Sequence, residues 1–166
     1  MRENQRAVLE RILAQDDQIA GVTIYFRAYT NSALRQAGLG DRYLEQLTSW
    51  RRMLADGLTT WAETDGNTRS DCHAWGASPN YELLRTVAGI DSMAPGFAEV
   101  RIAPNFGGLK HIQASMPHPK GEITVNLTRD GKRLNADVTL PAGIRGEFEW
   151  NATKRKLSAG ANHLVF

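Results

Sequence analysis

Hydrophobic and polar positions divide the chain into a first half with helical periodicity and a second half with β periodicity. Over residues 4–15, apolar side chains recur every three to four positions with charged residues between them, which predicts an amphipathic helix. Residues 21–38 are apolar on more than one side, which is typical of a helix buried between others. A third helix is expected over residues 42–56, where Asp41 is a suitable N-cap.

A fourth helix is expected over residues 79–88, and its pattern is compatible with two starting points. Ser78 is able to cap this helix with Pro79 at the first helical position, where the missing N–H of proline has no partner to lose. The helix is also able to begin nearer His73, with Pro79 inside its first turns. The local sequence is consistent with both.

The second half shows the alternation that is typical of half-buried strands. Its strongest signal is the pair of runs 121–130 and 132–141, which the dipeptide Asp130-Gly131 joins as a two-residue hairpin turn. Further strands are expected over residues 97–104, 109–119, 147–151 and 162–166. Short strands separated by turns predict a β-sandwich or part of a jelly roll.

The two halves are expected to form separate domains. Glycine, serine and proline accumulate over residues 89–97, which is typical of a boundary. We therefore assign residues 1–91 to a helical domain and residues 92–166 to a β domain, so the fold class is α+β.

Composition and charge exclude several classes of function. The 166 residues carry a net charge of +2, and lysine and arginine are scattered among acids without the basic stripe of a nucleic-acid-binding protein. No apolar run approaches the roughly 20 residues that cross a bilayer, and the polar residues 1–10 are unlike a secretory signal. Cys72 is the single cysteine, and the histidines of the second half lack metal-ligand spacing. We expect no cofactor, metal, nucleic-acid or membrane partner.

The stretch 58–84, which connects the third and fourth helices, concentrates reactive and aromatic side chains. Glu63 follows a mostly apolar segment that would carry its carboxyl group to the mouth of a loop, although most glutamates are simply solvated. His73 is able to donate to or accept from a hydroxyl group. Trp61 and Trp75 are able to stack on sugar rings or to pack in a core.

Several ordered motifs of this chain resemble the C-terminal end of bacterial α-L-rhamnosidases, glycoside hydrolase family 78. The motifs are TTWAE, SDCHAWGASPNYELLRTVAGI, PGF, IAP and ASMPHPKGEITV, and the resemblance covers essentially the whole chain. It implies that residues 1–91 form the C-terminal sector of a catalytic (α/α)6 toroid, a ring of six helical hairpins. Residues 92–166 would form the small antiparallel β-sandwich that follows this toroid.

The resemblance also implies roles for individual residues. Glu63 matches the position of the family's general base, which activates water in an inverting hydrolysis, and His73 matches a residue that contacts the sugar. Trp61 and Trp75 are candidate sugar contacts. The loop 64–72 is shorter than expected for the family, so the roles of Asp65, Arg69 and Asp71 within it stay unassigned.

The resemblance further predicts that the chain is inactive alone. The family's general acid lies earlier in the toroid, in a stretch with no equivalent in this sequence, and glycoside hydrolysis needs two carboxyl groups. We expect the C-terminal piece of an enzyme that removes terminal α-L-rhamnose from glycans or glycosides. Helical faces left uncovered by the missing part of the ring would favour self-association.

Two alternative functions stay open. The chain is also consistent with a stand-alone carbohydrate-binding or interaction module in which the β-sandwich binds the ligand. A different (α/α)-toroid glycosidase or phosphorylase is the other alternative, because several sugar-active families share that fold and a fold does not determine function.

Overall fold

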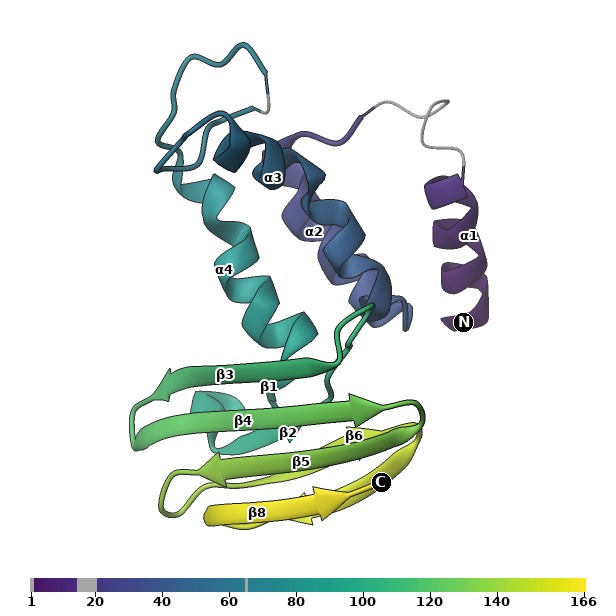
Figure 1. Ribbon diagram of the computed structural model, residues 1–166, viewed down its shortest axis with the longest axis vertical. Helices are drawn as coiled ribbons and strands as arrows, with labels where there is room; N and C mark the ends of the chain where they lie inside the picture. The colour runs from purple at the N-terminus through teal and green to yellow at the C-terminus, as the bar shows by residue number, and fades with distance from the viewer. Residues whose placement is uncertain (1, 15–20, 65) are drawn as a thin grey trace. The chain divides into compact units, whose positions relative to one another are not determined.

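The computed structural model describes residues 2–14, 21–64 and 66–166 and divides the chain into two compact units (Figure 1). The first unit is Met1–Glu82 and the second is Leu83–Phe166. Their boundary falls within the helical run that follows His73. The division at residues 91–92, inferred from composition, stays a prediction about domains.

The first unit is helical. Its elements are α1 (Arg2–Ala14), α2 (Ile24–Gln36), the 3-10 helix η2 (Gly40–Leu47), α3 (Thr48–Ala55), the 3-10 turn η3 (Ala74–Ala77) and α4 (Ser78–Glu82). A π-helical turn, η4 (Leu83–Val87), continues α4 into the second unit. The four predicted helices are therefore present, but the third begins as a 3-10 helix.

The fourth helix adopts the second of its two predicted starting points. His73 has an extended backbone (φ −118°, ψ 122°) and immediately precedes the 3-10 turn η3. Ser78 already has helical dihedral angles (φ −52°, ψ −31°), so it lies inside the helical run and does not cap it. His73 is thus placed where the loop ends and the helix begins.

Glycines with positive φ end α2 and α3 in the same way. After α2, Gly38 has φ +74° and donates its N–H to the Arg35 carbonyl at 3.1 Å, and Leu39 donates to the Leu34 carbonyl at 2.8 Å. This pair of bonds is a Schellman motif, which satisfies carbonyl groups that the helix end leaves free. Gly57 repeats the arrangement after α3.

One side of α2 faces the core of the first unit, where Ile24 and Leu34 are buried. Tyr25, Phe26 and Tyr29 on the same helix are exposed. Among the described residues, α2 is therefore covered on one apolar side and exposed on another, which is consistent with the expectation that some helical faces lack their neighbours.

The second unit contains two four-stranded sheets. The first has the order β1 (Ile90–Ser92), β2 (Glu99–Ile102), β6 (Arg145–Trp150) and β7 (Thr153–Leu157). The second has the order β3 (His111–His118), β4 (Gly121–Asp130), β5 (Arg133–Leu140) and β8 (Gly160–Val165). Figure 1 shows β3, β4, β5 and β8 side by side in one layer. A short 3-10 turn, η5 (Pro95–Phe97), joins β1 to β2.

Alternating apolar residues form the core between these sheets. Ile123, Leu127, Leu134 and Val138 of the second sheet are each no more than 1% exposed. Phe148 of β6 stacks on Phe166, which follows β8, with a centroid separation of 5.3 Å. The predicted hairpin of residues 121–130 and 132–141 is confirmed, but its two-residue turn is Gly131-Lys132 and not Asp130-Gly131, because Asp130 pairs with Arg133 as the last residue of β4.

The prediction of a wholly antiparallel sandwich is wrong in one place. Strands β2 and β6 pair in parallel, with Val100 opposite Gly146. A Cβ atom on Gly146 would lie 2.2 Å from the Val100 carbonyl oxygen, so this close pairing requires glycine. The intervening chain passes through the other sheet before it returns as β6, and such a crossover permits a parallel partner.

Two strands were not predicted, for different physical reasons. The strand β1 has three residues and lies in the Gly/Ser/Pro-rich segment expected to be a boundary. The strand β7 is an edge strand with sequence TKRKL, of which only Leu157 is buried, so it lacks an alternating apolar pattern. Charged residues on an edge strand oppose pairing with other chains. No described helix is long and apolar enough to cross a membrane.

Candidate functional site

The loop between α3 and η3 folds back on itself and brings the sequence-predicted residues together. The Glu63 N–H donates to the Ser70 carbonyl at 2.9 Å, and the His73 N–H donates to the Trp61 carbonyl at 2.8 Å. These backbone bonds hold residues 61–63 opposite residues 70–73. They place Glu63 and His73 on facing segments of one loop.

The Glu63 carboxylate is bound at two points by a neighbour in the same loop. Arg69 donates from Nε to Oε2 at 3.1 Å and from Nη2 to Oε1 at 2.5 Å. The Glu63 side chain is 14% exposed, whereas that of Arg69 is 87% exposed. The predicted site residue is therefore mostly covered and paired with an exposed guanidinium group.

Electrostatics keep this carboxyl group ionised. Hydrogen bonding from Arg69 lowers the pKa of Glu63, the charges of Arg69 and His73 lower it further, and partial burial opposes them. An ionised carboxylate is an acceptor only, so at neutral pH Glu63 is able to take a proton from a bound water molecule.

His73 is half-buried at the start of η3 and lies against Trp75. The two ring centroids are 4.4 Å apart at an interplanar angle of 49°. Its Nδ1 atom is buried and has no hydrogen-bond partner among the described residues. Buried polar atoms usually have a partner, so this nitrogen has hydrogen-bonding capacity that a ligand hydroxyl would satisfy.

Trp75 belongs to an exposed aromatic cluster that extends onto α2. We call the set Tyr25, Phe26, Tyr29 and Trp75 the aromatic cluster; the exposed fractions are 42%, 56%, 59% and 41%. Trp75 contacts Tyr25 edge-on at 5.6 Å, and Tyr25 contacts both Phe26 and Tyr29. Sequence reasoning missed the three members on α2, although aromatic residues at i, i+1 and i+4 on a predicted helix are a usable signal.

Trp61 differs from Trp75 in its surroundings. Its side chain is half-buried and packs against Gly76, where an added Cβ atom would lie 2.6 Å from the Trp61 Cβ. Gly76 also accepts a buried hydrogen bond from Trp50. Trp61 therefore supports the turn that carries Trp75, and a sugar contact by Trp61 stays a prediction.

The remaining residues of the loop carry little chemistry in this structure. Cys72 is an exposed free thiol. Asp65, whose role the sequence left unassigned, lies outside the described residues. Asp71 accepts a hydrogen bond from the Thr60 hydroxyl through its backbone carbonyl. Over residues 2–14, 21–64 and 66–166, no group of three or more His, Cys, Asp or Glu side chains is arranged to hold a metal ion.

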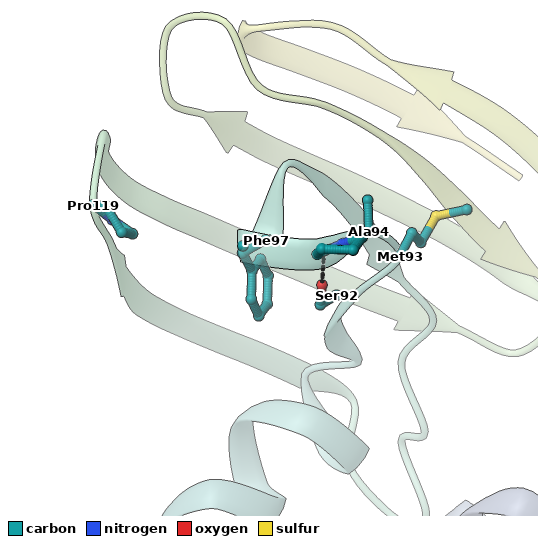
Figure 2. Close-up of a pocket in the computed structure, with 7 residues that line it drawn as sticks. Ser92, Met93, Ala94, Phe97 and Pro119 are labelled. Carbon is teal, nitrogen blue, oxygen red and sulfur yellow. Dashed lines mark hydrogen bonds between the residues drawn. The ribbon is translucent and has the colours of Figure 1, made fainter.

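The second unit has an open depression of different character. It is lined by Ser92, Met93, Ala94, Pro95, Gly96, Phe97 and Pro119 (Figure 2). Ser92 donates its hydroxyl to the Ala94 carbonyl at 2.7 Å, and the other lining side chains are apolar or absent. Without a carboxyl group in its lining, this depression is unsuited to acid–base chemistry, and the loop that carries Glu63 is the better candidate.

Comparison with known proteins finds a family similarity in the second half of the chain. A family model described as the bacterial alpha-L-rhamnosidase C-terminal domain matches residues 89–163. A curated α-L-rhamnosidase of Alteromonas sp. (strain LOR) is 26% identical over 102 residues, which are 61% of this chain and 11% of that protein.

Solved rhamnosidase structures share the fold of nearly the whole chain. The native enzyme from Aspergillus terreus has a TM-score of 0.83 at 17% identity, over 99% of this chain and 21% of its own. The family 78 rhamnosidase of Bacillus sp. GL1 has a TM-score of 0.79 at 26% identity, over 86% of this chain and 17% of its own. The Streptomyces avermitilis enzyme complexed with L-rhamnose has a TM-score of 0.70 at 16% identity, over 81% of this chain and 17% of its own.

These matches confirm the resemblance that the sequence motifs indicated. The chain spans about a tenth of the curated relative, 11%, and about a fifth of the A. terreus structure, 21%. The α+β architecture, helices followed by two small sheets, is the part of the predicted fold that the likeness confirms.

Proposed function

Because this chain corresponds to the C-terminal region of α-L-rhamnosidases of glycoside hydrolase family 78, we propose that it is a portion of such an enzyme. In this proposal it contributes one wall of a site that hydrolyses terminal α-L-rhamnosyl linkages with inversion. The observation that carries the proposal is the Glu63 carboxylate, which is mostly covered and paired with Arg69 on a loop whose two sides are hydrogen-bonded.

Glu63 would act as the general base. In an inverting glycosidase, one carboxylate takes a proton from water while the water oxygen attacks the anomeric carbon. The second carboxyl group protonates the departing glycosidic oxygen from the opposite side. The lowered pKa of Glu63, caused first by hydrogen bonding from Arg69, suits the base and not the acid.

His73 and Trp75 would hold the sugar. The unpartnered Nδ1 of His73 is able to bond a sugar hydroxyl, and the exposed face of Trp75 is able to pack on the C–H face of a pyranose ring. Trp61, joined to His73 through the backbone, would complete this wall. The proposed partner is a rhamnose-containing glycan or glycoside.

We propose that the helical unit is the C-terminal sector of the catalytic (α/α)6 toroid. The fold likeness to rhamnosidases over 99% of this chain, which is 21% of the matched structure, supports this placement. The general acid would then lie in the remaining part of the ring. The 166-residue chain is expected to be inactive alone, since acid assistance typically contributes about 10²- to 10⁴-fold.

Replacement of Glu63 tests the proposal. In the rhamnosidase that contains this chain, Glu63→Gln is expected to lower kcat on an aryl α-L-rhamnoside by about 10²- to 10⁴-fold, because glutamine cannot take the proton. Glu45→Gln is a matched control, since Glu45 is an exposed residue that is also paired with an arginine, Arg42. Near-normal turnover of Glu63→Gln would remove Glu63 from the mechanism. Clear turnover by the 166-residue chain would show that the acid lies within it.

A further inference from the structure

Arg69, which binds Glu63, lies in the loop 64–72, and the sequence assigned this arginine no role. We infer that Arg69 is a positioning residue for Glu63. Its two-point contact holds the carboxylate in one orientation and supplies the positive charge that compensates for the partial burial of that group. The inference rests on the proposed function of Glu63 as general base, and it deepens that function.

The backbone of the loop determines that Arg69 reaches Glu63. Glu63 bonds Ser70 through its N–H at 2.9 Å, which places residue 69 beside the carboxylate. Thr68 fixes the turn on the other side, because its hydroxyl donates to the Ser70 carbonyl at 3.0 Å and accepts from the Ser70 N–H at 3.3 Å. The contact is therefore built into the backbone conformation of the described residues Glu63, Thr68 and Ser70.

The geometry of the contact is specific to arginine. A guanidinium group presents its donors as a planar fork that matches the two oxygens of a carboxylate, whereas lysine is a single point charge. Nε and Nη2 of Arg69 bond different oxygens of Glu63. A two-point contact removes the rotation that a one-point contact would allow, so the carboxylate keeps one orientation toward the site.

The contact leaves Glu63 able to act as a base. An ionised carboxylate has about four lone-pair sites, and the fork occupies two of them. The remaining sites are able to accept from a water molecule. Arg69 likewise keeps N–H donors that the fork does not use, and its side chain is 87% exposed.

The positive charge of Arg69 affects the protonation of the Glu63 carboxylate. Among the described residues, the charged or titratable groups that act on Glu63 are Arg69, with the larger influence, and His73. The Glu63 side chain is only 14% exposed, and burial without a compensating charge favours the neutral acid. Loss of Arg69 would therefore leave Glu63 both more easily protonated and free to rotate.

Carbon-13 NMR titration of the side-chain carboxyl groups in the 166-residue chain tests the inference without any enzymatic assay. Arg69→Gln is expected to move the Glu63 titration to higher pH, and Arg69→Lys, which keeps the charge but loses the fork, is expected to move it less. Arg42→Gln is the matched control, because Arg42 pairs with Glu45 at 2.6 Å elsewhere in the same unit. An unchanged Glu63 titration in Arg69→Gln would overturn the inference.

The unsubstituted chain provides a measurement that does not depend on how the variants fold. The exposed guanidinium group is open to screening, which is substantial at 1 M salt, where the Debye length is about 3 Å. The Glu63 titration is expected to move to higher pH as sodium chloride is added. A titration that is independent of salt would count against a compensating charge at Arg69.

Kinetics of the whole rhamnosidase separate this inference from the proposed function. The acid limb of the pH profile of kcat/KM reports the base of the free enzyme. Arg69→Gln is expected to move that acid limb to higher pH. Arg69→Lys is expected to move it less, so that its position lies between those of the parent enzyme and Arg69→Gln. If Glu63→Gln abolishes turnover while Arg69→Gln leaves the limb in place, the inference fails. If Glu63→Gln retains turnover while the NMR titration shifts, the proposed base fails and the pairing of Arg69 with Glu63 stands.

Discussion

Trp50 donates its indole N–H to the carbonyl oxygen of Gly76 at 2.7 Å, and this buried bond ties α3 to the 3-10 turn that follows His73. The same glycine packs against Trp61 on the opposite side of the loop. Gly76 is therefore the point at which the two ends of the loop that carries Glu63 are joined to the helical core. The candidate site depends on this point for its shape.

Replacement of Trp50 by phenylalanine is expected to destabilise the first unit by about 1–3 kcal/mol. The ring volume is largely kept, but the Gly76 carbonyl loses its indole donor inside the protein. Urea unfolding measures the change in free energy. A variant as stable as the parent chain would mean that water replaces the indole N–H.

Gly76→Ala is expected to cost about 1–3 kcal/mol through overpacking. An added Cβ atom would lie 2.6 Å from the Trp61 Cβ and 3.3 Å from the Ala62 carbonyl oxygen, and neither atom is the end of a flexible side chain. Gly66→Ala is the control in the same loop, because nothing lies within 4 Å of its added Cβ atom. Equal melting temperatures for the two variants would contradict the close packing at Gly76.

The Glu63–Arg69 pair is expected to make stability depend on pH in the acid range. Hydrogen bonding from Arg69 lowers the pKa of Glu63 in the folded chain below the unfolded value of about 4.3. The stabilising contribution of the pair is therefore present above that pH and is lost as the pH falls through the folded pKa. Urea unfolding of the parent chain and Glu63→Gln is expected to give a stability difference that shrinks in this window. A difference that is independent of pH would exclude the linkage.

Self-association of the 166-residue chain is expected to depend on the aromatic cluster. Exposed apolar patches favour association, and Phe26 and Tyr29 are 56% and 59% exposed. The double variant Phe26→Ser/Tyr29→Ser is expected to shift sedimentation toward the monomer. Tyr81→Ser is the control, since Tyr81 is 55% exposed outside the cluster. A strictly monomeric parent chain at high concentration would contradict this prediction.

Local pattern was sufficient for most elements of secondary structure. The periodic apolar positions of residues 4–15 and 121–130 correspond to α1 and β4, and a two-residue turn joins β4 to β5, one position later than the predicted Asp130-Gly131. Such signals succeed because they depend on neighbours within one or two turns of the chain. The edge strand β7 was not predicted, because its charged residues are exposed and only Leu157 is buried, so no alternating hydrophobic pattern marks the strand.

The sequence by itself determined the order of helices before strands, the hairpin, and the stretch in which Glu63, His73, Trp61 and Trp75 lie. Only the tertiary structure decided that β2 pairs in parallel with β6 and that Tyr25 meets Trp75. It also distinguished the half-buried Trp61 from the exposed Trp75, and it brought Arg69 onto the Glu63 carboxylate. These contacts depend on how loops close and which faces pack. The free energy of loop closure and packing is spread over many residues far apart in the chain, so no local pattern reports it.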